Sequence, residues 1–355
     1  MTLVFKDVSL DVGGQTHIFP THIELAKAGF NILLGTTLSG KTTLMQIMAG
    51  LVKPTTGEIW FDGKNVTQMP VQKRNVSLVH QQFINYPNMN VFENIASPLR
   101  IVGMDKVKIR QRVESIAELL KMTPMLGRNP SELSGGQQQR TALARALVKD
   151  ADLVLLDEPL ANLDFKLREE LREELPKIFE DRGCCVVYAT TEPMEALLLG
   201  GHSVCLHEGR VTQFGKTSHI YRQPENLRSA KVFSDPPINT ASIIKKGSRI
   251  ALNDTVSWPL PKNLQKMIDG PYTLGIRPHH ITPVKPAGNS AKIDGKILVS
   301  ELSGSESTIH FTFDELSWVS QASGIHAFDI DTTTSFYIQT GNCLYFDNND
   351  RLVGT

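Results

Sequence analysis

The segment GTTLSGKT, residues Gly35 to Thr42, constrains the fold of this chain more than any other feature. It satisfies the pattern G-x-x-x-x-G-K-[ST], and it lies between an apolar run, Phe30–Leu34, and a helical pattern, Lys41–Ala49, that Gly50 closes. A glycine-rich loop in this position presents backbone N–H groups to phosphate at the positive end of a helix. The alternative is a glycine turn that only caps a helix, but at average residue frequencies a chance match to this pattern somewhere in the chain is on the order of 1%. The sequence therefore predicts a loop that binds the phosphates of a nucleotide.

Two side chains of this loop are expected to act on ATP and its metal ion. Lys41 would neutralise the β- and γ-phosphates, and the Thr42 hydroxyl would coordinate Mg²⁺. The nucleotide-binding residues that we expect in the loop are Gly35, Thr36, Thr37, Leu38, Ser39, Gly40, Lys41, Thr42 and Thr43.

A second element is the apolar run DLVLLDEP, which ends in Asp157 and Glu158. A strand that ends in acidic residues is common, and alone it would carry little weight. Together with the phosphate-binding loop, it supplies a carboxylate for Mg²⁺ and a second group that orients the attacking water. The sequence therefore predicts Asp157 as a metal ligand and Glu158 as a catalytic residue.

The segment LSGGQQQR, Leu133–Arg140, separates this chain from other P-loop proteins. A serine cap before two turn glycines explains part of it, but the whole run resembles the signature motif of the ATP-binding subunits of ATP-binding cassette (ABC) transporters. The resemblance covers essentially the whole chain and is closest to the importers of the carbohydrate-uptake type. It implies two shared ATP sites, each formed by the phosphate-binding loop of one subunit and the signature motif of another. The signature residues that would contact nucleotide are Ser134, Gly135, Gly136 and Gln137.

The same resemblance assigns roles to two further loops. Gln81 matches the glutamine that contacts Mg²⁺ and links the site to the membrane subunits, with Gln82 as the alternative if the register is shifted by one. The stretch Phe83–Pro87 resembles the surface that receives the permease, although an aromatic cluster could also be ordinary core. Ala161–Asp164 matches the loop that follows the catalytic glutamate, and Asp164 would also cap the next helix.

Three positions depart from the family pattern. Thr191 stands where the family has a histidine near the γ-phosphate, and a threonine can neither become a cation nor reach as far as imidazole. Val12 replaces an aromatic residue that stacks on adenine, and Leu38 replaces a glycine of the phosphate-binding loop. These changes predict a weakened ATP site beside an intact signature motif. The hypothesis that follows is a heterodimer with a second, non-identical ATPase.

The pattern of apolar runs predicts two domains. Up to about residue 234, strands alternate with helices, which indicates an α/β domain whose mostly parallel sheet is covered on both faces. After Asp235, short Val/Ile/Thr/Phe runs are separated by Gly, Asn, Asp and Pro, which is typical of an all-β barrel or sandwich. With the resemblance, we expect an ABC ATPase domain with a helical subdomain at 1–234 and an OB-like regulatory domain of the TOBE type at 235–355. The segment LGIRP, Leu274–Pro278, resembles this group of regulatory domains.

Charge and composition limit the possible partners. The 37 basic and 37 acidic residues cancel, which argues against nucleic acid and favours a regulatory and dimerisation role for the second domain. No apolar run approaches the ~18 residues of a membrane helix, so we expect membrane association through a partner. The four cysteines show neither metal-ligand spacing nor a disulfide framework, and reduced cytosol is the expected compartment.

The resemblance also suggests a solute and a set of partners. GTTLSGKTTLMQIMAGL, QQFINYPNMNVFENIASPLR and ATTEPMEALLLGG together resemble one of the paired ATPases of bacterial glycerol importers. This implies a second ATPase, two permeases and a periplasmic binding protein, with the chain on the cytoplasmic face of the inner membrane. Glycerol is the first choice of solute, before glycerol 3-phosphate and other polyols or sugars.

Two other interpretations compete with an importer ATPase. A cassette ATPase of DNA repair or translation usually carries two cassettes or a long coiled coil, whereas this chain has one of each motif and no sustained heptads. A regulatory subunit that hardly hydrolyses ATP is favoured by Thr191 and disfavoured by Glu158.

Overall fold

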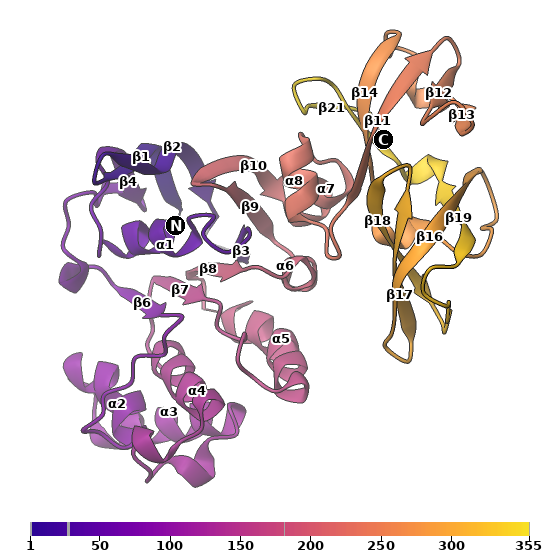
Figure 1. Cartoon of the computed structure of the whole chain (residues 1–355). Helices are drawn as coiled ribbons and strands as arrows, with labels where there is room; N and C mark the ends of the chain where they lie inside the picture. Colours follow the sequence, from indigo (N-terminus) through magenta and orange to yellow (C-terminus); the bar gives the residue numbers. More distant parts are fainter. Residues whose placement is uncertain (1, 27–28, 181, 355) are drawn as a thin grey trace. The chain divides into compact units, whose positions relative to one another are not determined.

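The computed structural model describes residues 2–26, 29–180 and 182–354. Contacts within the chain divide it into two compact units, Met1–Ser218 and His219–Thr355, shown in Figure 1. The sequence places the change of domain near residue 235, and the contacts place it earlier. The reason is that a short helix before residue 235 packs on the C-terminal strands.

The first unit is built on a six-stranded sheet with the order β10-β9-β3-β8-β7-β6. All neighbouring strands are parallel except β10 and β9. Every residue of β3, β7 and β8 is buried, as expected for parallel strands covered on both faces. The expected parallel sheet is therefore confirmed. Its strands are β3 (Phe30–Leu34), β6 (Val76–Val79), β7 (Leu153–Asp157), β8 (Cys185–Thr190), β9 (His202–His207) and β10 (Arg210–Lys216).

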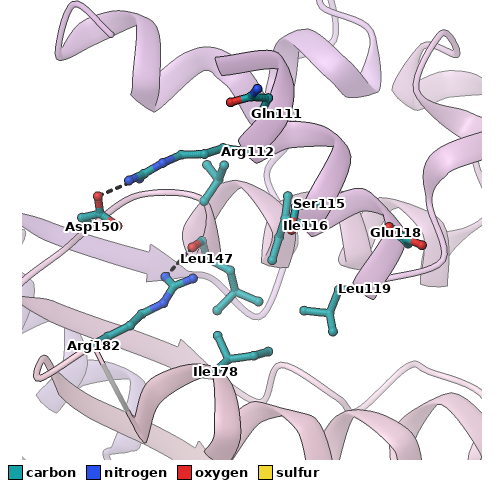
Figure 2. Close-up of a pocket in the computed structure, with 11 residues that line it drawn as sticks. Gln111, Arg112, Ser115, Ile116, Glu118, Leu119, Leu147, Asp150, Ile178 and Arg182 are labelled. Atoms are coloured by element: carbon teal, nitrogen blue, oxygen red, sulfur yellow. Dashed lines mark hydrogen bonds and ion pairs between the residues drawn. The ribbon is translucent and has the colours of Figure 1, made fainter. Parts of the chain in front are cut away.

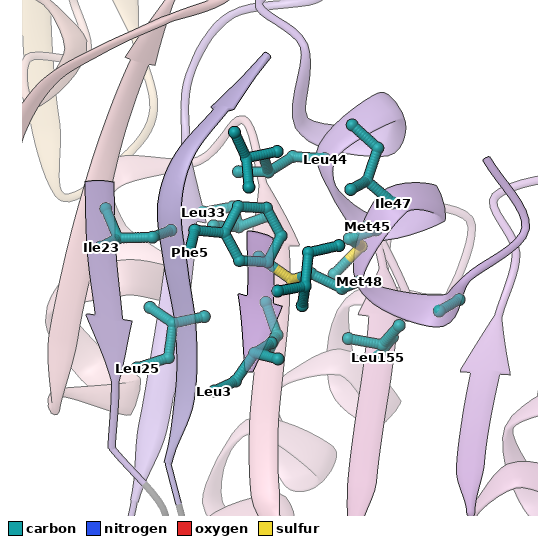
Figure 3. Close-up of a cluster of buried hydrophobic side chains, with 14 of the residues drawn as sticks. Leu3, Phe5, Ile23, Leu25, Leu33, Leu44, Met45, Ile47, Met48 and Leu155 are labelled. Carbon is teal, nitrogen blue, oxygen red and sulfur yellow. The ribbon is translucent and has the colours of Figure 1, made fainter. Parts of the chain in front are cut away.

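A second, antiparallel sheet with the order β2-β1-β4-β5 packs with helix α1 (Lys41–Ala49). Figure 3 shows Leu44, Met45, Ile47 and Met48 of α1 in one cluster with residues of both sheets. We expected helices on both faces of the parallel sheet, and this face is instead covered by a helix and a sheet. The pairing joins β1 to β4 across about fifty residues of chain, which local periodicity does not reveal. These strands are β1 (Leu3–Val12), β2 (Gln15–Leu25), β4 (Thr56–Phe61) and β5 (Lys64–Asn65).

The remaining helices of the first unit include a helical subdomain of three packed helices, α2, α3 and α4. A cavity of about 710 Å³ lies where α3 and the end of α4 meet the end of α5. Figure 2 shows the residues that line it. At this place Arg112 pairs with Asp150 at 2.6 Å, and Arg182 donates to the carbonyl of Leu147 at 2.6 Å. The two arginines thus tie the subdomain to its neighbours. The helices are α2 (Val91–Ile101), α3 (Lys106–Leu119), α4 (Gly135–Leu147), α5 (Phe165–Glu180) and α6 (Pro193–Leu199), with 3₁₀ turns at Val71–Lys73, Thr123–Met125 and Pro130–Glu132.

The second unit contains two antiparallel sheets, with the orders β13-β12-β11-β14-β20-β21 and β15-β19-β16-β17-β18. Both contribute to one core that includes Trp258, Leu274, Phe311, Trp318 and Phe336. This all-β arrangement is consistent with the expected OB-like domain. The strands are β11 (Asn239–Lys246), β12 (Arg249–Ala251), β13 (Ser257–Pro259), β14 (Gly270–Ile276), β15 (Ile281–Thr282), β16 (Ser290–Leu302), β17 (Glu306–Phe313), β18 (Leu316–Ser323), β19 (Thr333–Gln339), β20 (Leu344–Phe346) and β21 (Leu352–Gly354). Three 3₁₀ turns lie at Lys262–Leu264, Pro278–His280 and Thr340–Asn342.

Helices α7 (Thr217–Arg222) and α8 (Leu227–Val232) explain the early division between the units. Leu227 and Ala230 of α8 form a small core with Ile238, Leu344 and Phe346. The N–H of Leu227 also donates to the carbonyl of Asp350 at 2.9 Å. These contacts attach α8 to the C-terminal strands, although it lies before residue 235.

No helix in the described part of the chain combines the length and the apolar character that a membrane crossing needs.

Phe5 is fully buried in the core that α1 and the two sheets share (Figure 3). We therefore expect its side chain to contribute strongly to stability. Phe5→Ala should lower the free energy of unfolding by about 3–5 kcal/mol, because the cavity it leaves cannot close fully. Urea denaturation measures the loss. Ile101→Ala, at a position that is 84% exposed, serves as the control and should change stability by less than about 0.5 kcal/mol. Equal stability of the two variants would contradict this packing.

Candidate nucleotide site

The candidate site lies at the carboxyl ends of β3, β7 and β8, where the loop 35–40 leads into α1. Gly40, at φ +103°, makes the turn into the helix, and an added Cβ there would lie 2.9 Å from Ile18. A cavity of about 250 Å³ opens at this edge. Ligands of open α/β sheets bind at this kind of edge. The residues that line the cavity are His17, Thr37, Leu38, Ser39, Gly40, Lys41, Thr42, Thr43, Gln81 and Glu158.

Lys41 is a buried cation, only 5% exposed. Its Nζ donates to the carbonyls of Gly35 at 2.7 Å and Thr36 at 3.0 Å, and it lies 3.7 Å from Oε1 of Glu158. Burial lowers the pKa of Lys41, and the carboxylates of Glu158 and Asp157 oppose that shift. A cation held by neutral carbonyls and one carboxylate can exchange these partners for the oxygens of a phosphate.

Asp157, at the end of β7, and Thr42, on α1, bring two oxygen atoms together that could bind a metal ion. The Thr42 hydroxyl donates to Oδ2 of Asp157 at 2.7 Å, and Asp157 is 2% exposed. Its Oδ1 is buried without a hydrogen-bond partner among the described residues. Burial raises the pKa of Asp157, whereas the bond from Thr42 and the charges of His80 and Lys41 lower it. An unpaired buried carboxylate oxygen beside a hydroxyl fits a magnesium ion, which prefers oxygen ligands.

Glu158 follows in a strained backbone conformation, with φ +47°. Its N–H donates to the carbonyl of Ala189 at 3.0 Å, and its Oε2 accepts a hydrogen bond from Nε2 of Gln81 at 3.1 Å. Gln81 lines the cavity and Gln82 does not, so the geometry favours Gln81 in the proposed register. Left-handed backbone at a non-glycine residue costs about 1–2 kcal/mol and tends to mark functional positions. The strain here coincides with the carboxylate nearest to Lys41.

The structure does not bring the signature segment to this cavity. Ser134 caps α4, where its hydroxyl accepts from the N–H of Gln137 at 3.4 Å and its own N–H donates to Gln137 Oε1 at 3.0 Å. Gly136 packs on the loop after Glu158, since an added Cβ would lie 3.4 Å from the carbonyl of Asn162. Ser134 and Gly135 remain exposed, and residues 134–137 are absent from the cavity lining. Within one chain, the two halves of an expected ATP site are therefore separate.

The three positions that depart from the family pattern are all exposed. Thr191 follows Thr190, whose carbonyl accepts from the N–H of Gly35 at 3.4 Å, so it lies next to the phosphate-binding loop. Val12 is 50% exposed at the end of β1, and Leu38 is 96% exposed with φ +65°. A glycine at position 38 would take this conformation without strain.

His17 is a site residue that sequence reasoning missed. It comes to the cavity because Gly209 joins β2 to the loop: the N–H of Gly209 donates to Ser39 O at 2.9 Å, and its carbonyl accepts from the N–H of Phe19 at 2.9 Å. Only glycine fits there, because a Cβ would lie 2.2 Å from the carbonyl of His17. The turn at Gly13 and Gly14 was the available signal, since a hairpin there carries His17 back along β1.

Similarity to known proteins identifies the family of this chain. The ABC transporter family model matches residues 20–161. The sn-glycerol-3-phosphate import ATP-binding protein UgpC of Pectobacterium atrosepticum is 33% identical over 353 residues, which cover 99% of this chain and 98% of that protein. The UgpC of Yersinia pestis bv. Antiqua, strain Antiqua, is 32% identical over 99% of this chain and 95% of its own length.

The chain belongs to the ATP-binding subunits of ABC transporters. Solved structures agree with this assignment. The dimeric structure of MJ0796, a bacterial ABC transporter cassette, matches with a TM-score of 0.57 and 28% identity over 61% of this chain and 98% of its own. A dimeric post-hydrolysis state of MJ0796 bound to ADP and Pi matches equally well. This ABC subunit is therefore an ATPase that binds nucleotide, as the sequence indicated.

The buried carboxylate of this ABC subunit leads to a prediction about pH. Because burial raises the pKa of Asp157 above 3.8, the folded state holds this proton more tightly than the unfolded state. The contribution of Asp157 to folding is then most favourable below the ordinary pKa and is lost as the pH rises through the raised value. Asp157→Asn should therefore raise the free energy of unfolding at about pH 7, and this gain should shrink toward about pH 4.

Urea denaturation at a series of pH values measures this effect, and ATPase assays of the same variant should show lost activity. Asp254→Asn, at an exposed position, is the control and should show neither change. An Asp157→Asn variant with a lower free energy of unfolding than the parent at neutral pH would contradict this prediction.

Proposed function

We propose that this chain energises the import of a small polyol or polyol phosphate by hydrolysing ATP at sites shared between two cassettes. The observation that carries this proposal is the separation of the two half-sites. Lys41, Thr42, Asp157 and Glu158 converge on one edge of the sheet, whereas Ser134 lies exposed elsewhere. A second cassette would supply the missing half, and MJ0796, which has the same fold, is dimeric.

Each residue has a proposed role that follows from its position. The N–H groups of the loop and Lys41 bind the phosphates, while Glu158, oriented by Gln81, positions the attacking water and accepts its proton. Thr42, Asp157 and Gln81 would hold Mg²⁺, which supplies charge neutralisation at the phosphates when bound. The helix that starts at Ser134 offers its N–H groups to the γ-phosphate of the partner site.

The chain would work at the cytoplasmic face of the bacterial inner membrane, bound to permease subunits. Membership of the importer ATPases implies membrane partners, and Phe83–Pro87 is the proposed contact. Ile84 is 58% exposed and Tyr86 is 46% exposed, with the guanidinium of Arg145 4.7 Å from the Tyr86 ring. Exposed apolar side chains fixed by such a contact suit a protein interface better than a core.

The solute is proposed from relatives and resemblance together. The full-length relatives named above are glycerol 3-phosphate import proteins, whereas the sequence motifs resemble the glycerol importers. We place glycerol 3-phosphate and glycerol side by side, ahead of other polyols and sugars. A periplasmic binding protein and the permeases would select between them, and the second unit would serve regulation and dimerisation.

Uptake by cells that depend on this chain tests the proposal. Lys41→Ala removes the phosphate cation and Ser134→Arg blocks the signature half-site, so each should reduce accumulation of labelled glycerol 3-phosphate or glycerol to background. Lys177→Ala, at an exposed lysine on α5, is the control and should leave uptake intact. The solute whose accumulation falls in the variants is the one that the transporter imports. Undiminished uptake of both solutes in both variants would refute the proposed function.

A second candidate is an asymmetric heterodimer in which this chain holds the weaker ATP site. Exposed Thr191 and half-exposed Val12 favour it, because neither supplies the charge or the ring that their positions have in the family. The intact Glu158 and signature motif would then serve mainly the partner site. A homodimer remains the competing arrangement.

Turnover by the purified chain separates the two arrangements. If the heterodimer is correct, the isolated chain should hydrolyse ATP slowly. Thr191→His should then raise its kcat by up to about 100-fold, the contribution of a positioned imidazole. Thr191→Gln is the matched control, because it adds length without a positive charge. If the chain alone matches the intact transporter and Thr191→His adds nothing, the asymmetric arrangement is wrong.

A further inference from the structure

Arg168, on the first turns of α5, joins two loops that are far apart in the sequence. Its Nη2 donates to the carbonyls of Ala161 at 3.0 Å and Leu163 at 3.5 Å. Its Nη1 donates to Oε1 of Glu192 at 3.1 Å, and the side chain is 23% exposed. One guanidinium thus holds the loop after Glu158 and the loop after β8 together.

Both loops belong to the nucleotide edge of the sheet. The first loop follows Glu158 in the chain and is bonded to it: the N–H of Ala161 donates to the carbonyl of Glu158 at 3.3 Å. It also supports the signature helix, because the carbonyl of Asn162 lies beside Gly136. The second loop contains Thr191, directly before Glu192. Arg168 therefore contacts the backbone between Glu158 and the signature helix on one side, and the neighbour of Thr191 on the other.

Glu192 is a fixed partner for this arginine. Its second oxygen, Oε2, accepts from Nη2 of Arg172 at 2.7 Å. Arg172 in turn pairs with Glu195 at 3.1 Å, and buried Glu195 accepts hydrogen bonds from Tyr188 at 3.0 Å and Thr190 at 2.6 Å. Glu192 is therefore anchored to β8 and α6, and a movement at this end would be transmitted through Arg168 to the loop 161–164.

We propose that Arg168 is a positioning residue that sets the distance between the loop 161–164 and Thr191, and thereby the placement of Glu158 for ATP turnover. The proposal rests on the role proposed above for Glu158. Arginine is required because three acceptors in two directions match its planar fork, whereas lysine offers a single nitrogen. ATP binding should not depend on Arg168, since the cavity lining does not include it.

Steady-state ATPase kinetics of the full-length protein, in complex with its transporter partners, test this role. Arg168→Gln should lower kcat by about 10- to 100-fold, the usual cost of slight misplacement of a catalytic group, with KM for ATP little changed. Arg168→Lys should recover only part of the loss. Glu192→Gln should lower kcat as well, and the double variant should fall no further than Arg168→Gln, because both changes break the same link.

The controls separate positioning from folding and from the proposed function itself. Lys177→Gln removes a cation from the same helix at an exposed ion pair and should leave kcat unchanged. If Arg168→Gln lowers kcat only in proportion to the fraction unfolded in a thermal melt, the residue is structural and the inference is overturned. Full kcat in both Arg168 variants beside an inactive Glu158→Gln would overturn this inference alone. An active Glu158→Gln would instead remove the proposed role of Glu158.

Discussion

The site depends on one buried cation, Lys41, in the field of two carboxylates, Glu158 and Asp157. Lys41 lies 3.7 Å from Glu158, and burial lowers the pKa of its ammonium group, while the charges of Glu158 and Asp157 oppose that shift. The carbonyls of Gly35 and Thr36 accept hydrogen bonds from the ammonium group and hold it in place. This balance requires β3 and β7 to end at the same level, on either side of β8, and the parallel sheet provides it.

The local motifs could be predicted because each is a short run of chain whose chemistry is complete in itself. The loop 35–43, the end of β7 and the cap at Ser134 all lie where the sequence placed them. His17 and Arg168 were not predicted, because the position of each arises from contacts across the fold, through Gly209 and through Glu192 respectively. The antiparallel sheet was missed for the same reason.

The division between the two units shows a related limit. The sequence pattern up to residue 234 indicates strands that alternate with helices, but such a pattern cannot say against what a helix such as α8 packs. Leu227 and Ala230 pack on strands more than a hundred residues later, and a bridge joins Asn226 to Arg351. Composition changes near residue 235, shortly before the first strand of the second unit at Asn239, whereas contacts change earlier, where the chain starts to pack on its own C-terminal strands. A domain boundary follows contacts, and composition approximates it only when the two coincide.

Contacts also separate Thr191 from its neighbours in the sequence. Its neighbours carry the local structure: Thr190 binds Glu195 and the N–H of Glu192, and Glu192 binds both arginines of α5. Among the residues that the structure describes, no hydrogen bond uses the Thr191 side chain, which is exposed. The identity of residue 191 is therefore nearly free of folding constraints, and a histidine would fit the same loop. In the proposed site, the threonine would therefore change the chemistry near the γ-phosphate without disturbing the hydrogen bonds of Thr190 and Glu192 around it.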